Sequence, residues 1–255
     1  MAQMLNPSSL LLNNHDDSIR DYLQKMKDFD KPNKNDITVS RDYKTLKKVV
    51  KRLKRMELFI GHGNFQLLSF DEGIYFARKY SQVGEFTGEE LTFMEKIFYM
   101  DASQCGFYGD KPIGNIIEGI DKKKVSKIPY SGTYLYKDTA LELFNNIKKE
   151  VGEDLILTSG VRGIMKQFLL FLNKAYKNNG NLSLASRALA PPGYSFHGIG
   201  DFDVGEQGLG TDNFTAHFTE TTVYSKLIEL GYLKLRYPQE NLLGVRFEPW
   251  HIRIS

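Results

Sequence analysis

Three short stretches in the second half of the chain carry polar side chains that packing alone does not require. They are "TSGVRGIMKQ" from residue 158, "YSFHGIGDFDVG" from residue 194 and "FEPWHI" from residue 247. Their two histidines, His197 and His251, and the carboxylate of Asp203 are ligand types of a catalytic zinc, which takes three protein ligands and leaves one position for water. Glu248 would then be the base. The residue types therefore indicate hydrolysis assisted by a metal ion.

The backbone around these residues must turn their side chains toward one point. In an extended segment Asp201 and Asp203 point to one face and Phe202 to the other, so that face can bind a metal while Phe202 enters the core. Glu248 and His251 would lie on opposite faces of an ideal strand. The proline between them cannot join a regular ladder, which predicts a bend that turns both groups toward the same metal.

The three stretches resemble, in order and in content, the motifs of the zinc D-alanyl-D-alanine carboxypeptidases of the VanY and LdcB type, the LAS metallopeptidases. "SFHGIGDFD" is similar to their Ser-x-His-x-x-Gly-…-Asp motif, "EPWH" to their Glu-x-Trp-His motif and "SGVRGIMKQ" to their Ser-Gly-Tyr-Arg-Ser-…-Gln motif. The similarity covers about Ile128 to the end of the chain. Each motif alone is weak, but the three together are specific.

The resemblance implies a metal centre with defined roles. His197, Asp203 and His251 would be the zinc ligands and Glu248 the general base. The implied cofactor is Zn²⁺, and the implied fold is an α+β peptidase domain of the LAS and hedgehog type, a small, mainly antiparallel sheet flanked by helices.

The resemblance also implies three residues that handle the substrate. Arg162 would polarise the scissile carbonyl and stabilise the oxyanion, while Gln167 and Ser195 would help to hold the peptide end.

Two departures from the family pattern concern the site itself. The family has seven steps from the first His to the Asp, whereas His197 to Asp203 is six, so one residue is missing before the ligand strand. Asp201 stands where the family has Ala, and it is the alternative ligand. Val161 replaces the family's Tyr, which changes the pocket wall.

The implied function is removal of the terminal D-Ala from peptidoglycan stem peptides, of either the D,D or the L,D linkage. A related endopeptidase and a non-catalytic, zinc-containing cell-wall-binding module are the alternatives; the presence of both Glu248 and Arg162 argues against the second. A peptidoglycan substrate implies work in the bacterial envelope, and we expect the periplasm, with an export signal that this sequence does not contain. No oligomeric state is indicated.

Composition agrees with a soluble globular protein. The hydrophobic content of 41% supports a core, and a net charge of +3 without a recognition motif gives no reason to expect a nucleic-acid partner. No stretch is long and apolar enough for a transmembrane segment. The single cysteine, Cys105, excludes an internal disulfide and a cysteine-rich zinc site. His62 and His217 have no matching partners, and we expect neither to act directly.

The first half is predicted to be an arm followed by helices. Residues 1–40 are polar and rich in Asn, Asp, Lys and Pro, which indicates a loosely packed arm. Residues 41–125 form a helical region of unassigned role, with an amphipathic helix from residue 40 and a second helix opened by a Thr87–Glu90 capping box. We expect this region to narrow access to the zinc and so to favour short, uncrosslinked peptides.

The second half, residues 126–255, is predicted to be the zinc carboxypeptidase domain. Its expected elements are a helix capped by Thr139 with Glu142, a buried strand over 155–157, a helix ending at Gly180, a long loop over 181–213, a helix over 219–232 and strands over 233–238 and 244–254.

Overall fold

The computed structural model describes residues 22 and 24–254, so most of the predicted arm lies outside the described residues. The part of the arm that is described is attached to the protein. Asp36 forms a buried ion pair with Arg187, and Thr38 bridges to Asn181. These contacts tie the arm to a segment about 150 residues further along the chain.

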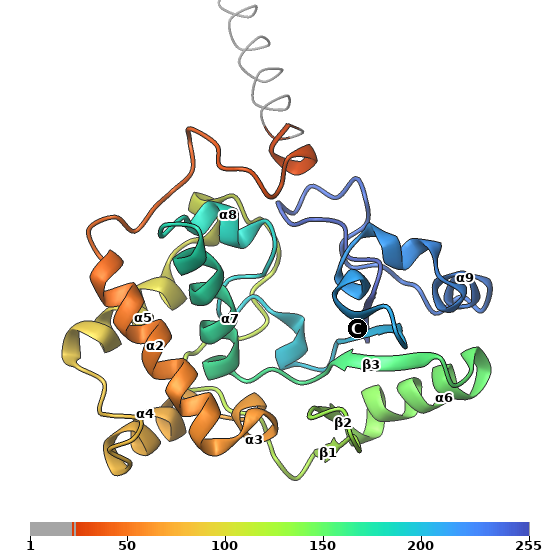
Figure 1. The fold of residues 1–255 in the computed structure, drawn as a ribbon, viewed down its shortest axis with the longest axis horizontal. Coiled ribbons are helices and arrows are strands. Elements are labelled where there is room, and N and C mark those ends of the chain that lie inside the picture. Colours follow the sequence, from red (N-terminus) through yellow and green to blue (C-terminus); the bar gives the residue numbers. More distant parts are fainter. Residues whose placement is uncertain (1–21, 23, 255) are drawn as a thin grey trace, which may run out of the picture.

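Six helices share one apolar core (Figure 1). They are α2 (Tyr43–Ile60), α3 (His62–Gln66), α4 (Phe70–Lys79), α5 (Gly88–Tyr99), α7 (Ile164–Lys177) and α8 (Leu182–Ser186). The last two belong to the second half of the sequence, and α7 contributes the buried residues Phe168 and Phe171. The predicted boundary near Val125 therefore separates sequence segments that share a core, and the division into domains remains a prediction.

The helices of the first half form where spacing and caps predict them. In α2, Leu46, Val49 and Leu53 recur at helical spacing and are buried. Helix α5 starts with the expected capping box, in which Thr87 accepts from the Glu90 amide while the Glu90 side chain accepts from the Thr87 amide.

The second half is built on a three-stranded antiparallel sheet, so the predicted α+β class is confirmed. Its order is β3 (Leu155–Ser159), β4 (Phe202–Glu206) and β5 (His251–Ile252). A separate hairpin pairs β1 (Val125–Lys127) with β2 (Tyr134–Tyr136). Helices α6 (Glu142–Val151) and α9 (Thr222–Glu229) contribute to the core around this sheet.

Short 3₁₀ turns complete the chain and carry part of the site. They are η1 (Ala102–Cys105), η3 (Phe196–Gly198), η4 (Gly210–Phe214) and η5 (Ala216–Glu220). No helix in the described part of the chain combines the length and the apolar character needed to cross a membrane.

Three predicted elements differ in the structure. The capping box at Thr139 is absent, because residues 137–141 form a wider π-helical turn (η2, Lys137–Leu141) that leads directly into α6. The loop over 181–213 contains α8 and the central strand β4. Helix α7 ends at Lys177, three residues before Gly180.

The two predicted C-terminal strands are largely absent. Residues 233–238 are irregular, because Arg236 turns inward to Asp201 and the segment joins no ladder. Of residues 244–254, only His251 and Ile252 pair with the sheet.

Candidate active site

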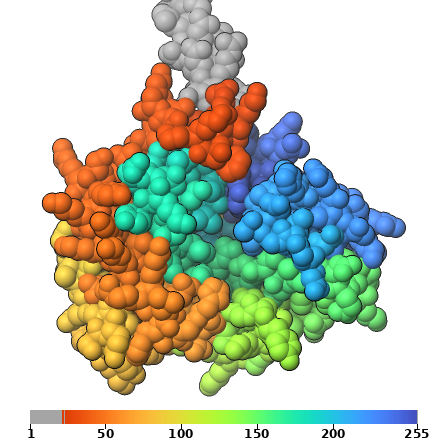
Figure 2. Space-filling model, viewed as in Figure 1, coloured from red at the N-terminus to blue at the C-terminus, as the bar shows by residue number. Residues whose placement is uncertain are grey.

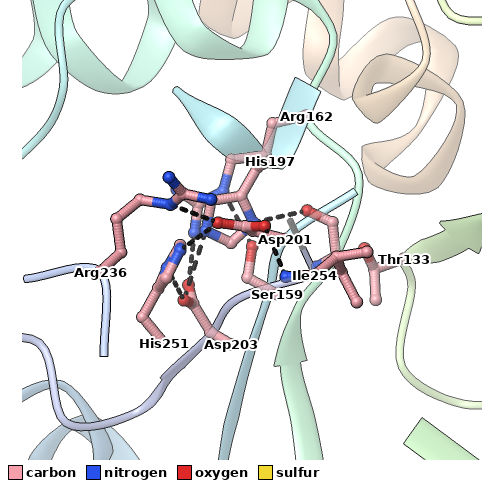
Figure 3. Close-up of polar contacts among 10 residues, drawn as sticks. Thr133, Ser159, Arg162, His197, Asp201, Asp203, Arg236, His251 and Ile254 are labelled. Atoms are coloured by element: carbon pink, nitrogen blue, oxygen red, sulfur yellow. Dashed lines mark hydrogen bonds and ion pairs between the residues drawn. The ribbon is translucent and has the colours of Figure 1, made fainter. Parts of the chain in front are cut away.

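The structure brings the three predicted metal ligands together. His197 lies in η3, Asp203 in β4 and His251 in β5 (Figure 3). One ligand atom of each lies within 4.8 Å of the others, and all three residues are at least 96% buried. Residues 54 positions apart in the sequence therefore form one compact group.

Strand register explains this convergence. Asp203 is paired with His251 across β4 and β5, and Asp203 also faces Ser159 at an irregularity in β3. The chain enters β5 through a turn in which the His251 amide donates to the Glu248 carbonyl at 3.3 Å. Pro249 lies in this turn, so the predicted bend between Glu248 and His251 is confirmed.

The distances from Asp203 to the two imidazoles are close to those around a tetrahedral metal. Asp203 Oδ1 lies 3.3 Å from His197 Nε2 and 3.1 Å from His251 Nδ1. Two ligands of a tetrahedral zinc, each at about 2.0–2.2 Å from the ion, lie about 3.3–3.6 Å apart. The donor set and its spacing therefore fit Zn²⁺.

Hydrogen bonding orients His197 for such a role. Its Nδ1 lies 2.9 Å from the Gly160 carbonyl oxygen, which can only accept, so Nδ1 carries the proton and Nε2 presents a lone pair to the group. Burial, followed by the Arg162 charge, lowers the pKa of His197 and keeps the ring neutral, as a metal ligand must be.

The second oxygen of Asp203 is held by a cation. Arg162 Nη2 donates to Asp203 Oδ2 at 2.6 Å, and Arg162 Nε donates to Ser159 Oγ at 2.8 Å. Burial alone would raise the pKa of Asp203, but the Arg162 charge and the hydrogen bond from His251 hold it well below its usual range. Asp203 is therefore ionised, with Oδ1 directed to the two imidazoles.

Of the two candidate carboxylates, Asp203 belongs to the ligand group and Asp201 lies behind it. Asp201 Oδ2 is 2.9 Å from His251 Nε2, on the other side of the ring from Asp203 (Figure 3). Burial lowers the pKa of His251, but hydrogen bonds to Asp201 and Asp203 outweigh it and raise the pKa to about 9.

A cavity of about 320 Å³ opens onto the group. Figure 2 shows the surface hollowed between the segment that contains α7 and α8 and the C-terminal segment. The predicted residues in its wall are Arg162, Ser195, His197, Asp203, Glu248 and His251. Burial raises the pKa of Glu248 above its ordinary value, although the nearby His251 opposes this shift.

Gln167 is the one predicted site residue that is not in the cavity wall. Its Nε2 donates to the Arg162 carbonyl at 2.8 Å, and its Oε1 accepts from the Gly193 amide at 2.9 Å. Gln167 therefore supports the backbone around the cavity, and its direct contact with a peptide remains a prediction.

The helical region supplies wall residues that sequence reasoning missed. His62 and Gln66 of α3 line the cavity, as does Lys166 at the start of α7. Lys166 Nζ and His62 Nδ1 lie 2.6 and 3.0 Å from the same oxygen of Glu57. No local signal marks these residues, except that Lys166 lies beside the predicted Gln167.

The small antiparallel sheet with a buried His–Asp–His group at one end of its strands defines an α+β protein with a candidate catalytic metal centre. Residues 134–254 match the family model of the D-alanyl-D-alanine carboxypeptidases, VanY. This match confirms the resemblance to the VanY/LdcB-like family that the motifs of this part of the chain predict. No curated protein is significantly similar to the chain.

Solved structures of similar proteins cover 57–59% of the chain. The LD-carboxypeptidase LdcB is 24% identical with a TM-score of 0.42, over 57% of this chain and 65% of that one. A Zn(II) complex of a mutant VanY D,D-pentapeptidase from a VanB-type vancomycin resistance cassette is 24% identical with a TM-score of 0.43, over 59% and 86%. The D,D-dipeptidase VanXYg, bound to a D-Ala-D-Ala phosphinate analogue, is 19% identical with a TM-score of 0.47, over 58% and 61%. This chain thus spans slightly less than two thirds of the LdcB and VanXYg chains.

Proposed function

We propose that the protein is a zinc-dependent carboxypeptidase that removes the terminal D-Ala from peptidoglycan stem peptides in the bacterial envelope. The observation that carries this proposal is the buried group of His197, Asp203 and His251, which shares one cavity with Glu248 and Arg162. The match of residues 134–254 to the VanY family model supports the substrate class.

The reaction is hydrolysis of a peptide bond. A zinc ion held by His197, Asp203 and His251 supplies a Lewis acid that makes water nucleophilic near neutral pH. Glu248 accepts a proton from the attacking water and returns it to the leaving amine as the C–N bond breaks. Because burial raises the pKa of Glu248, this pKa is closer to the working pH than that of an exposed glutamate.

Arg162 stabilises the negative charge that develops on the scissile carbonyl oxygen. Its side chain is 16% exposed and lies in the cavity wall, fixed by Ser159 and Asp203. A guanidinium held in place before the reaction meets the oxyanion without reorganisation, and loss of such a donor commonly costs about 10² to 10³ in rate.

The helical region contributes to substrate selection. Gln66 is 4% exposed, lines the cavity, and its Oε1 has no hydrogen-bond partner among the described residues. The wall formed by His62 and Gln66 supports the expectation that this region limits access to short, uncrosslinked peptides.

The test is mass spectrometry of purified muropeptides after incubation with zinc-loaded protein. Pentapeptide and tetrapeptide substrates separate the D,D from the L,D linkage, and we expect loss of one alanine mass from one of them. A chelator and Glu248→Gln should abolish the loss. Glu85→Gln, which changes an exposed, ion-paired glutamate, is the matched control and should leave it intact.

Other results would redirect the proposal. Cleavage within crosslinked or longer stem peptides would identify an endopeptidase. Binding of peptidoglycan fragments without any cleavage by the zinc-loaded protein would identify a binding module.

A further inference from the structure

A second carboxylate lies behind the metal group, on the far side of His251. Asp201 is 1% exposed, and its Oδ2 lies 2.9 Å from His251 Nε2. Its Oδ1 accepts from the Ile254 amide at 3.0 Å. Asp201 therefore contacts the imidazole nitrogen that does not face Asp203, and both of its oxygens are engaged.

Asp201 is itself fixed by a cation. Arg236 Nε donates to Asp201 Oδ2 at 2.7 Å (Figure 3). The Arg236 guanidinium carbon lies 3.3 Å from the centre of the Phe196 ring. Phe196 immediately precedes His197 in η3. One arginine thus connects the support of His251 to the turn that carries His197.

We propose that Asp201 is a positioning residue for the metal centre. It holds His251 with the proton on Nε2 and the lone pair of Nδ1 directed to the metal, and Arg236 fixes Asp201 in this position. This inference rests on the proposed zinc site. Its basis is geometric: each ring nitrogen faces a carboxylate, and a carboxylate can only accept. Asp203 would share the metal with Nδ1, which leaves Asp201 as the acceptor for a proton on Nε2.

The arrangement has a measurable consequence for metal affinity. A metal-bound histidine whose other ring nitrogen donates to a carboxylate is fixed in tautomer and orientation and is a more basic ligand. Loss of such a partner typically weakens metal binding about 10- to 100-fold. In this chain the partner stands two residues before the ligand Asp203, so the segment that enters β4 supports one ligand and β4 itself supplies another.

The experiment measures zinc affinity by competition with a chromophoric chelator for the wild type, Asp201→Asn, Asp201→Ala and Arg236→Gln. We expect Asp201→Ala to bind zinc about 10- to 100-fold more weakly. The other two variants should be weakened in the same direction. Long-range ¹H–¹⁵N spectra of the histidine rings in zinc-loaded protein should show His251 protonated on Nε2 in the wild type, and this signal should shift in Asp201→Asn.

Asp36→Asn is the matched control. Asp36 is also a buried aspartate paired with an arginine, Arg187, but it lies outside the cavity. It should lower thermal stability without changing zinc affinity.

The outcomes separate this inference from the proposed function. A wild type that binds no zinc would overturn the zinc site, and the inference with it. A wild type that binds zinc, with folded Asp201 and Arg236 variants that bind it equally well, would overturn the inference alone. If Asp201→Asn does not fold, the affinity of Arg236→Gln decides, because that change leaves Asp201 in place.

Discussion

Replacement of Gly160 by alanine should damage the site without touching any of its ligands. A Cβ on Gly160 would lie 2.1 Å from the Tyr134 carbonyl oxygen and 3.0 Å from Thr133 Oγ1. The first distance is about 1 Å shorter than any tolerable contact. The oxygen belongs to the backbone of β2, so it cannot move away by a side-chain rotation. The hairpin and the end of β3 must therefore separate.

This separation would affect the backbone that orients His197. The Gly160 carbonyl accepts from His197 Nδ1, and the next two amides, of Val161 and Arg162, donate to the Tyr134 and His197 carbonyls at 2.8 and 3.1 Å. Overpacking of this kind typically costs about 1–3 kcal/mol of stability. A displacement of about 1 Å at a catalytic group costs about 10²-fold in rate.

The assay combines urea unfolding, zinc affinity and muropeptide turnover for Gly160→Ala. Gly114→Ala is the control, because a Cβ at Gly114 meets nothing within 4 Å and its backbone is not in the left-handed region. If Gly160→Ala matches Gly114→Ala in all three measurements, the close approach of β2 to Gly160 does not position His197, and the reasoning is refuted.

Three further predictions concern stability and reactivity. Burial lowers the pKa of His251, but its carboxylate partners outweigh this and raise the pKa from 6.5 to about 9. In the zinc-free protein the contribution of His251 to stability should therefore be complete below pH 6.5 and be lost as the pH rises through 9. Thermal melts at increasing pH should show this fall in stability, and His251→Gln should flatten it. Burial raises the pKa of Cys105 to about 11, so about one thiol in a thousand is ionised at pH 8. A thiol reagent should therefore label the native protein only as fast as the structure around Cys105 opens. Fast labelling of the native protein would contradict this. Thr87→Ala removes the capping box of α5 and should lower the free energy of unfolding, measured with urea, by about 0.5–2 kcal/mol while turnover is unchanged. Equal stability would mean that the cap contributes nothing.

Sequence patterns predicted those features that depend on neighbouring residues. The apolar spacing of α2, the cap of α5 and the bend at Pro249 are all encoded within a few positions, and the motif order predicted the ligand group. Strand β4 was expected only as an extended piece of a long loop, because it is five residues long and is stabilised by partners far away in the sequence.

Features that depend on register were not predictable. The contact between Asp201 and His251 joins residues 50 positions apart, and it exists because β4 and β5 pair at Asp203. An acid in place of the family's alanine was the available signal, and it was interpreted as an alternative ligand. Residues 233–238 alternate like a strand, yet Arg236 uses its inward position for an ion pair with Asp201.

Helix α7 belongs to the helical core along its length and to the cavity at its start. Its Phe168 and Leu172 are buried among the helices of the first half, while the Gly163 amide, one residue after Arg162, donates to the Gln66 carbonyl at 2.6 Å. Unfolding of the helices of the first half would therefore also break the hydrogen bond that holds the backbone next to Arg162. The amides of α7 and of the segment that carries Arg162 should thus exchange with deuterium as one cooperative unit, and a protein cut near residue 125 would leave α7 with an exposed apolar face.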